Sequence, residues 1–221
     1  MNSIVIDLEM NEIDLEQHPL PHKTCRFEVM EIGAVKLDEN FNQIDEYKTY
    51  IKPQMNPIGE RYTQLTGISD ETVKDARSFT EAFKEFCEWC GTGYKIISWG
   101  GTDKAQIKAE CLFKGIEPAD IKYMMKNWLD FQALFSKNLG IYKSVGLKDA
   151  VNYAGIDAEG DFHDAYWDAK NTASLYRMFK LDFDNLRTVM KPYIESMKKA
   201  QAMTFSLGEL LKNIDVDSNK A

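Results

Sequence analysis

Short apolar runs separated by polar turns mark the first fifty residues of the chain. Residues 3–9 (SIVIDLE), 29–37 (VMEIGAVKL) and 43–53 (QIDEYKTYIKP) combine β-branched and other apolar side chains. Runs of this length and composition are typical of β-strands. The turn-like sequence DENFN separates the second run from the third. The close spacing of the three runs predicts an antiparallel meander.

Helical patterns alternate with strands between residues 78 and 180. Ser78 and Glu81 form a capping-box signature that predicts a helix over FTEAFKEFCEWC. Residues 54–77 show no regular pattern and are expected to be irregular. Two further strands are expected at 94–99 and 127–131, and three further helices at 103–114, 147–155 and 164–179. This order predicts an α/β fold with a mixed sheet flanked by helices.

The character of the sequence changes after residue 180. Residues 181–203 form an amphipathic helical pattern that contains Pro192, and SLGELLKNI and a polar tail follow it. We therefore divide the chain into a domain at 1–180 and a helical appendage at 181–221. The appendage is expected to pack back onto the domain; a homodimer or partner contact through it is the alternative.

The composition changes this picture mainly by exclusion. The 221 residues are 44% hydrophobic and 28% charged, which is ordinary globular usage. No apolar run is long enough to span a membrane, and the N-terminus lacks the pattern of a signal peptide. Four cysteines fit a reduced, cytoplasmic protein; Cys87 and Cys90 close a helical pattern, and no second pair completes a zinc site. The net charge of −8 argues against holding nucleic acid by bulk charge, but not against gripping a few nucleotides.

Two carboxylates stand two residues apart in the first predicted strand, Asp7 and Glu9. Alternation along a strand places both on one face, about 6.5–7 Å apart at Cα. Such a pair on an apolar strand repels and resists burial, and divalent cations would remove both objections. The alternative is that these residues form the solvated end of the strand.

A third carboxylate, Asp103, follows the strand predicted at 94–99. Asp103 and Gln106 have the spacing of an N-terminal cap for the next helix, and Thr102 is an alternative cap. Ligand groups also gather at strand ends in α/β sheets. The pattern alone leaves capping and ligand binding both open.

A histidine and a fourth carboxylate, His163 and Asp168, lie at the start of the helix predicted at 164–179. Residues five apart cannot share a helical face. They converge only if His163 lies in the preceding loop, with Asp164 as the N-terminal cap of the helix. A carboxylate on a buried helical face needs a partner such as a metal ion, and a histidine beside carboxylates is a candidate base.

Taken in order, these motifs carry a resemblance to a known family. Asp7-Leu-Glu9, then Asp103 after a strand, then His163 and Asp168 opening a helix resemble the DEDDh group of DnaQ-like 3′–5′ exonucleases. EIGAVKL, LTGI and DAKNTA are similar to other patterns of the family. The gap between Met10 and Glu28 and the run FEVMEI are similar to its ERI-like branch. The resemblance covers about residues 3–180.

The resemblance implies an RNase H-like fold with a five-stranded mixed sheet flanked by helices. It implies two divalent cations, Mg²⁺ or Mn²⁺, held by Asp7, Glu9, Asp103 and Asp168. His163 would be the general base for in-line attack of water on a terminal phosphodiester, which releases a nucleoside 5′-monophosphate. Met10, Leu65 and Thr66 would line the site of the terminal nucleotide.

The chain departs from the family pattern at two positions. ERI-like enzymes often have an aromatic residue before the third carboxylate, where this chain has Thr102. Trp99 or Tyr62 would then supply the stacking surface for a base. Asp164 stands where a small or basic residue commonly follows the histidine.

The expected substrate is a single-stranded nucleic acid with a 3′ end, with RNA or short oligonucleotides favoured over DNA. Two alternatives remain open at the level of sequence. One is a regulatory or docking protein on the exonuclease fold, in which catalysis is secondary. The other is a two-metal endonuclease, which would cut circular substrates.

Overall fold

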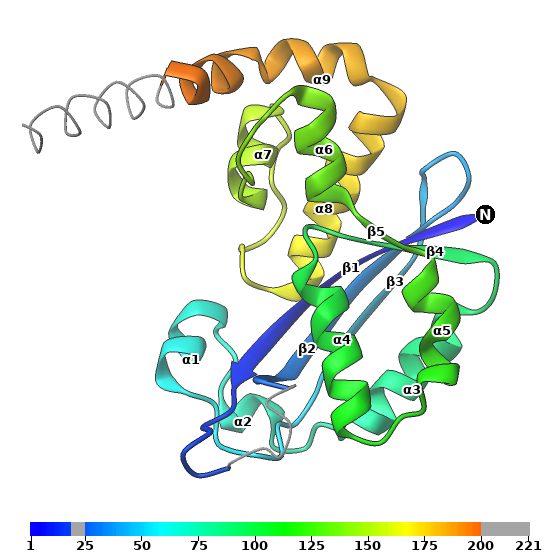
Figure 1. The fold of residues 1–221 in the computed structure, drawn as a ribbon, viewed down its shortest axis with the longest axis vertical. Helices are drawn as coiled ribbons and strands as arrows, with labels where there is room; N and C mark the ends of the chain where they lie inside the picture. The colour runs from blue at the N-terminus through cyan, green and yellow to red at the C-terminus, as the bar shows by residue number, and fades with distance from the viewer. Residues whose placement is uncertain (19–24, 200–221) are drawn as a thin grey trace, which may run out of the picture.

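The computed structural model describes residues 1–18 and 25–199, and its centre is one five-stranded sheet in the order β3-β2-β1-β4-β5 (Figure 1). The strands are β1 (Asn2–Glu12), β2 (Phe27–Leu37), β3 (Gln43–Tyr50), β4 (Tyr94–Ser98) and β5 (Trp128–Asp130). β1 pairs with β2 and β2 with β3 in antiparallel fashion, whereas β4 runs parallel to both β1 and β5. The predicted α/β fold, with an antiparallel meander joined to parallel strands, is confirmed.

Nine helices are named over the described residues: α1 (Glu60–Thr66), α2 (Asp70–Val73), α3 (Phe79–Cys90), α4 (Thr102–Phe113), α5 (Pro118–Lys126), α6 (Phe131–Leu139), α7 (Leu147–Tyr153), α8 (Ala165–Leu181) and α9 (Phe183–Val189). The Ser78–Glu81 capping box is present at the start of α3. The prediction that residues 54–77 are irregular is wrong, because α1 and α2 lie there. α1 buries no residue, so it lacks the apolar period by which a helix is found in sequence.

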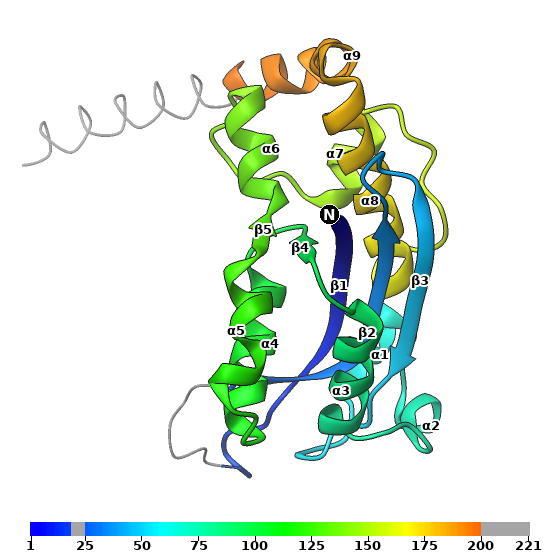
Figure 2. The ribbon, with the colours of Figure 1, turned by 90° about the vertical axis from the view of Figure 1, so that its right-hand side faces the viewer.

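The sheet separates two hydrophobic cores. Side chains at even positions of β1, such as Ile4 and Ile6, pack with α3, α4 and α5. Val5 points to the other face and packs with α6, α7 and α8. Figure 2 shows α4 and α5 on one side of β1 and α8 on the other. Because side chains alternate along a strand, the odd positions of β1 that follow Val5 also face α8.

The described part of the appendage packs on the second core. Leu186, Met190 and Tyr193 are buried there beside residues of α8. The single helix predicted across Pro192 is wrong: α9 ends at Val189, and a separate helical stretch covers 191–199 with Pro192 in its first turn. Proline lacks an N–H and is tolerated there but not in a helix interior. The segment SLGELLKNI and the polar tail lie outside the described residues.

None of the helices in the described ranges combines the length and the apolar character that crossing a membrane requires. All four cysteines are free thiols, and Cys90 closes α3 as the sequence predicted.

Candidate active site

The first two carboxylates of the site lie on β1, on the face toward α8. Asp7 is the partner of Gly33 in the β1–β2 register, and Glu9 is the partner of Glu31. A register shift between Glu9 and Met10 follows immediately. Glu9 is buried and Asp7 half-buried, so they do not form a frayed, solvated strand end.

Asp103 joins this pair from the start of α4, but not as a helix cap. Gly101 is the N-cap residue, and no side chain among the described residues caps the helix, which excludes the capping alternative for both Asp103 and Thr102. Asp103 is buried, and the backbone amide of Leu8 hydrogen-bonds to it. Gln106 donates to the carbonyl of Phe27 at 2.8 Å instead of closing a capping box.

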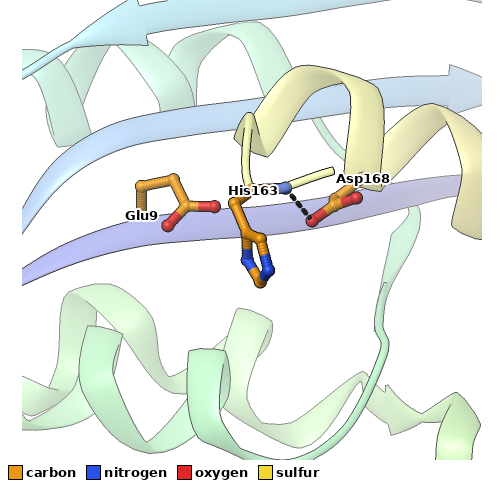
Figure 3. Close-up of side chains that lie close together, drawn as sticks. All are labelled: Glu9, His163 and Asp168. Carbon is orange, nitrogen blue, oxygen red and sulfur yellow. Dashed lines mark hydrogen bonds between the residues drawn. The ribbon is translucent and has the colours of Figure 1, made fainter. Parts of the chain in front are cut away.

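His163 lies in the loop before α8, and Asp168 lies inside its first turn. Asp164 caps the helix by accepting hydrogen bonds from Tyr166 N and Trp167 N, which confirms the predicted N-cap. The N–H of His163 donates to Asp168 Oδ2 at 3.0 Å. Figure 3 shows the imidazole between the carboxylates of Glu9 and Asp168. One ligand atom from each of these three residues lies within 4.8 Å of the others.

Burial and mutual repulsion raise the pKa values of the two strand carboxylates. Burial raises the pKa of Asp7 well above 3.8, and the charges of Asp103, Asp168 and Glu9 raise it further. Burial, followed by the charges of Asp168 and Glu31, raises the pKa of Glu9 to about 9. Glu9 and Asp168 also belong to one group of ligand atoms within 4.8 Å of one another. With Asp103 acting on Asp7, the elements β1, α4 and α8 each bring an acidic side chain to this region.

The two helix-borne carboxylates show the same effect. Burial raises the pKa of Asp103 to about 7, although hydrogen bonds from backbone amides oppose the shift. Burial also raises the pKa of Asp168, against the hydrogen bond and charge of His163. Proteins bury carboxylates only where protons, cations or hydrogen bonds offset the cost. These four residues therefore make a candidate site for positive charge.

The donor set fits divalent cations. Within residues 1–18 and 25–199, no lysine or arginine forms an ion pair with any of the four carboxylates. Asp168 Oδ1 is buried, and none of the described residues hydrogen-bonds to it. By contrast, the buried carboxylate of Glu28 is paired with Lys114 at 2.8 Å. Oxygen-only ligands of this kind suit hard cations such as Mg²⁺ and Mn²⁺.

An open pocket of about 450 Å³ adjoins Glu9. Its lining comes from β1, the start of β2, α1 and α4: Leu8, Glu9, Met10, Arg26, Phe27, Tyr62, Leu65, Thr102, Ala105, Gln106 and Ala109. Met10 and Leu65, which the resemblance assigned to the terminal nucleotide, both line it. Thr66 does not; its hydroxyl donates to the carbonyl of Tyr62 at the end of α1. Arg26 is the basic residue that the described part of the chain contributes to the lining.

Trp99 lies apart from this pocket. Its ring packs edge-on against Phe131 and Phe135, and its Nε1–H donates to the carbonyl of Val145 at 3.0 Å. The expectation that Trp99 stacks on a base does not fit this placement. Tyr62 lines the pocket and is the remaining candidate for that role.

Three residues of this region were not singled out from the sequence. Arg26 lines the pocket, Glu31 is buried opposite Glu9, and Lys48 reaches Glu31 from β3. Glu31 carried a usable signal, since an acidic residue interrupts the apolar run VMEIGAV just as Asp7 does in its own strand. Arg26 and Lys48 carried none, because exposed basic residues are common on any surface.

Comparison with known proteins places this chain in a family. The family model described as "Exonuclease" matches residues 4–176. The chain is 29% identical over 198 residues to ERI1 exoribonuclease 2 of Mus musculus, which covers 78% of this chain but 27% of the mouse protein. It is 25% identical to the probable 3′-5′ exonuclease KapD of Bacillus subtilis, over 95% of this chain and 96% of that protein.

The fold is similar to that of the nuclease domain of 3′hExo, a DEDDh family member solved bound to rAMP. The TM-score is 0.67 at 21% identity, over 82% of this chain and 92% of that one. The two chains therefore share their architecture across nearly the whole nuclease domain. Together with the model match over most of the chain, this confirms the resemblance drawn from the sequence motifs: the chain belongs to the exonuclease family.

Proposed function

We propose that this chain is a 3′–5′ exonuclease that hydrolyses the terminal phosphodiester of single-stranded nucleic acid and releases nucleoside 5′-monophosphates. The observation that carries the proposal is the convergence of carboxylates from β1, α4 and α8 with an imidazole, beside an open pocket. The exonuclease names of its relatives support the direction of the reaction.

Asp7, Glu9, Asp103 and Asp168 would hold two divalent cations, Mg²⁺ or Mn²⁺. When bound, such ions polarise the scissile phosphoryl group and stabilise the leaving 3′ oxygen. The four side chains supply oxygen ligands only, which matches the preference of these ions. Where no cation is bound, protonation of the carboxylates relieves the repulsion among them.

His163 acts as the general base in this proposal. Its imidazole lies beside the carboxylates of Glu9 and Asp168 and is exposed, so water can reach it. An imidazole can accept a proton at neutral pH, and a positioned base typically contributes about 10²–10⁴-fold to a rate. His163 therefore removes the proton from the water that attacks the phosphorus.

The pocket beside Glu9 takes the terminal nucleotide. Met10 and Leu65 offer apolar contacts to the base, and Tyr62 offers an aromatic ring for stacking. Arg26 supplies a positive charge for a phosphate in an otherwise acidic region. RNA or short oligonucleotides are favoured over DNA, on the ERI-like motifs and on the exoribonuclease name of the mouse relative.

The test is the release of mononucleotides from a 3′-labelled oligonucleotide with Mn²⁺. The wild-type protein should release labelled nucleoside 5′-monophosphate, and Asp7→Ala should not. Asp75→Ala is the matched control, because Asp75 is an exposed aspartate. Matched RNA and DNA strands of one sequence, degraded in parallel, measure the substrate preference.

Other outcomes separate the competing functions. Cleavage of a circular strand would indicate an endonuclease and overturn the exonuclease proposal. Binding of single strands without release of mononucleotides, at any divalent cation concentration, would indicate a docking protein on this fold.

A further inference from the structure

One lysine connects the sheet to the residue beside the candidate base. Lys48 on β3 places its Nζ 2.6 Å from Asp164 Oδ2 and 3.0 Å from Glu31 Oε1. Glu31 lies opposite Glu9 in the β1–β2 register, and Asp164 directly follows His163. A single ammonium group therefore joins two carboxylates that border the cation site without belonging to it.

The other oxygen of each of these two carboxylates binds the backbone at the start of α8. Asp164 Oδ1 accepts hydrogen bonds from the N–H groups of Tyr166 and Trp167, at 3.1 and 3.2 Å. Glu31 Oε2 accepts one from Ala165 N at 3.0 Å. Two consecutive residues, Asp164 and Ala165, are thus tied to the sheet, one through Lys48 and one through Glu31.

His163 needs such support because its backbone is strained. Its φ is 70°, in the left-handed region that residues with a Cβ rarely adopt. A conformation of this kind persists only where its surroundings determine it. The side chain is exposed, so packing around the imidazole does not hold it. What holds it is the bond from its own N–H to Asp168 and the anchoring of Asp164.

The positive charge of Lys48 also balances the negative charges of Asp164 and Glu31. Burial would lower the pKa of Lys48, but hydrogen bonds and charge from Asp164 and Glu31 outweigh it and raise the pKa. Lys48 therefore stays charged at neutral pH. Without it, the buried Glu31 would lose its ion-pair partner, and its charge would add to the repulsion on Glu9.

We propose that Lys48 is a positioning residue for the reaction: by pairing with Asp164 and Glu31 it holds the start of α8, and with it the backbone that aims the His163 imidazole. The inference rests on the proposed function. It names a residue outside the cation ligands and the nucleotide pocket that acts through its neighbours.

The first test separates kcat from KM on the labelled oligonucleotide. Lys48→Met should lower kcat about 10- to 100-fold with KM within about twofold, because a displacement of about 1 Å can cost a hundredfold in rate. Lys48→Arg keeps a cation between the two carboxylates and should restore most of kcat. Lys36→Met is the control, because Lys36 is also a lysine of this sheet with ionic and backbone contacts, to Asp45 and to the carbonyl of Trp89.

The second test needs neither metal nor substrate. Amide hydrogen exchange over residues 163–168 should be faster in Lys48→Met than in the wild type, while exchange in β1 and β2 stays unchanged. Asp164→Asn, which retains an N-cap residue but loses the charge, should show the same local effect. This second variant keeps the inference testable if Lys48→Met does not fold.

The outcomes distinguish the two proposals. An inactive wild-type protein would overturn the exonuclease function, and the exchange experiment would still report on Lys48. An active wild type with unchanged kcat in Lys48→Met, or faster exchange spread across the whole sheet, would overturn the positioning role.

Discussion

The backbone N–H of His163 donates to Asp168 Oδ2 at 3.0 Å, and the other oxygen of that carboxylate, Oδ1, is buried without a hydrogen-bond partner among residues 1–18 and 25–199. The two oxygens of the Asp168 carboxylate thus have different roles. Oδ2 holds the loop that carries the imidazole, and Oδ1 is the oxygen that the proposed function assigns to a cation. Geometry and charge at this residue can therefore be separated by substitution.

Asp168→Asn tests that separation. The amide oxygen can still accept from His163 N, but the negative charge is lost. We expect activity to fall about hundredfold or more, because metal ions supply several kcal/mol of charge stabilisation and each 1.36 kcal/mol is tenfold in rate. The melting temperature without metal should not fall. Wild-type turnover in this variant would show that Asp168 does not act through a cation.

The stability of the metal-free protein should decrease as pH rises, and a bound divalent cation should counteract this decrease. Burial raises the pKa of Glu9 from 4.5 to about 9 and that of Asp103 from 3.8 to about 7. The folded protein therefore binds more protons than the unfolded chain between those values. This contribution is fully present below the unfolded pKa values and is lost as pH rises through the folded ones.

The melting temperature of the metal-free protein should accordingly fall between pH 5 and pH 9. Mg²⁺ or Mn²⁺ should raise it most at the alkaline end, where the carboxylates are charged. Asp7→Asn should weaken the pH dependence, whereas Asp75→Asn should leave it as it is. A metal-free melting temperature that rises from pH 5 to pH 9 would contradict the arrangement.

Two substitutions of His163 separate its chemistry from its backbone. Both His163→Ala and His163→Gly remove the base, so kcat should fall about 10²–10⁴-fold in each. Only glycine adopts a φ of 70° without penalty, so the glycine variant should be more stable than the alanine variant by about 1 kcal/mol. Denaturant unfolding measures this difference. Equal stabilities would mean that the left-handed backbone is not retained in solution.

Gly33 sets how closely α8 approaches the sheet. A Cβ there would lie 2.1 Å from Ala165 C and from Tyr166 N, both backbone atoms that cannot move alone. Gly33→Ala should destabilise the protein by about 1–3 kcal/mol through overpacking, and should lower kcat because the start of α8 moves. At Gly146, a Cβ would meet nothing within 4 Å. Gly146→Ala is the control and should change kcat little.

Arg26 should affect binding more than turnover. Arg26→Gln removes the basic side chain that the described residues supply to the pocket lining. KM should rise about tenfold with kcat nearly unchanged, since a hydrogen bond to a charged group is worth about 1.5–3 kcal/mol. The slope of log affinity against log salt should decrease by about 0.7, the value for one phosphate on a single strand. Arg77→Gln, which removes an arginine paired with Glu85, is the control. An unchanged salt slope would argue against a phosphate contact at Arg26.

Elements with a strong local pattern were predictable from the sequence. β1 and β2 were found because β-branched residues fill them, and α3 and α8 because each begins at a capping residue and then repeats its apolar positions. α1 was missed because it buries no side chain. A periodic apolar pattern arises where a helix or strand packs on a hydrophobic core, and α1 buries no side chain in such a core.

The candidate site divides in the same way. The sequence by itself determined the succession of strands and helices along the chain, the cap at Asp164, and the types and spacing of the acidic residues and the histidine, because these depend on neighbours along the chain. Only the tertiary structure decided that Asp103 turns inward instead of capping α4, that Trp99 packs away from the pocket, and that Lys48 reaches Asp164 across 116 positions. Those outcomes depend on which distant segments pack together, and the periodicity of side chains within one segment does not indicate this.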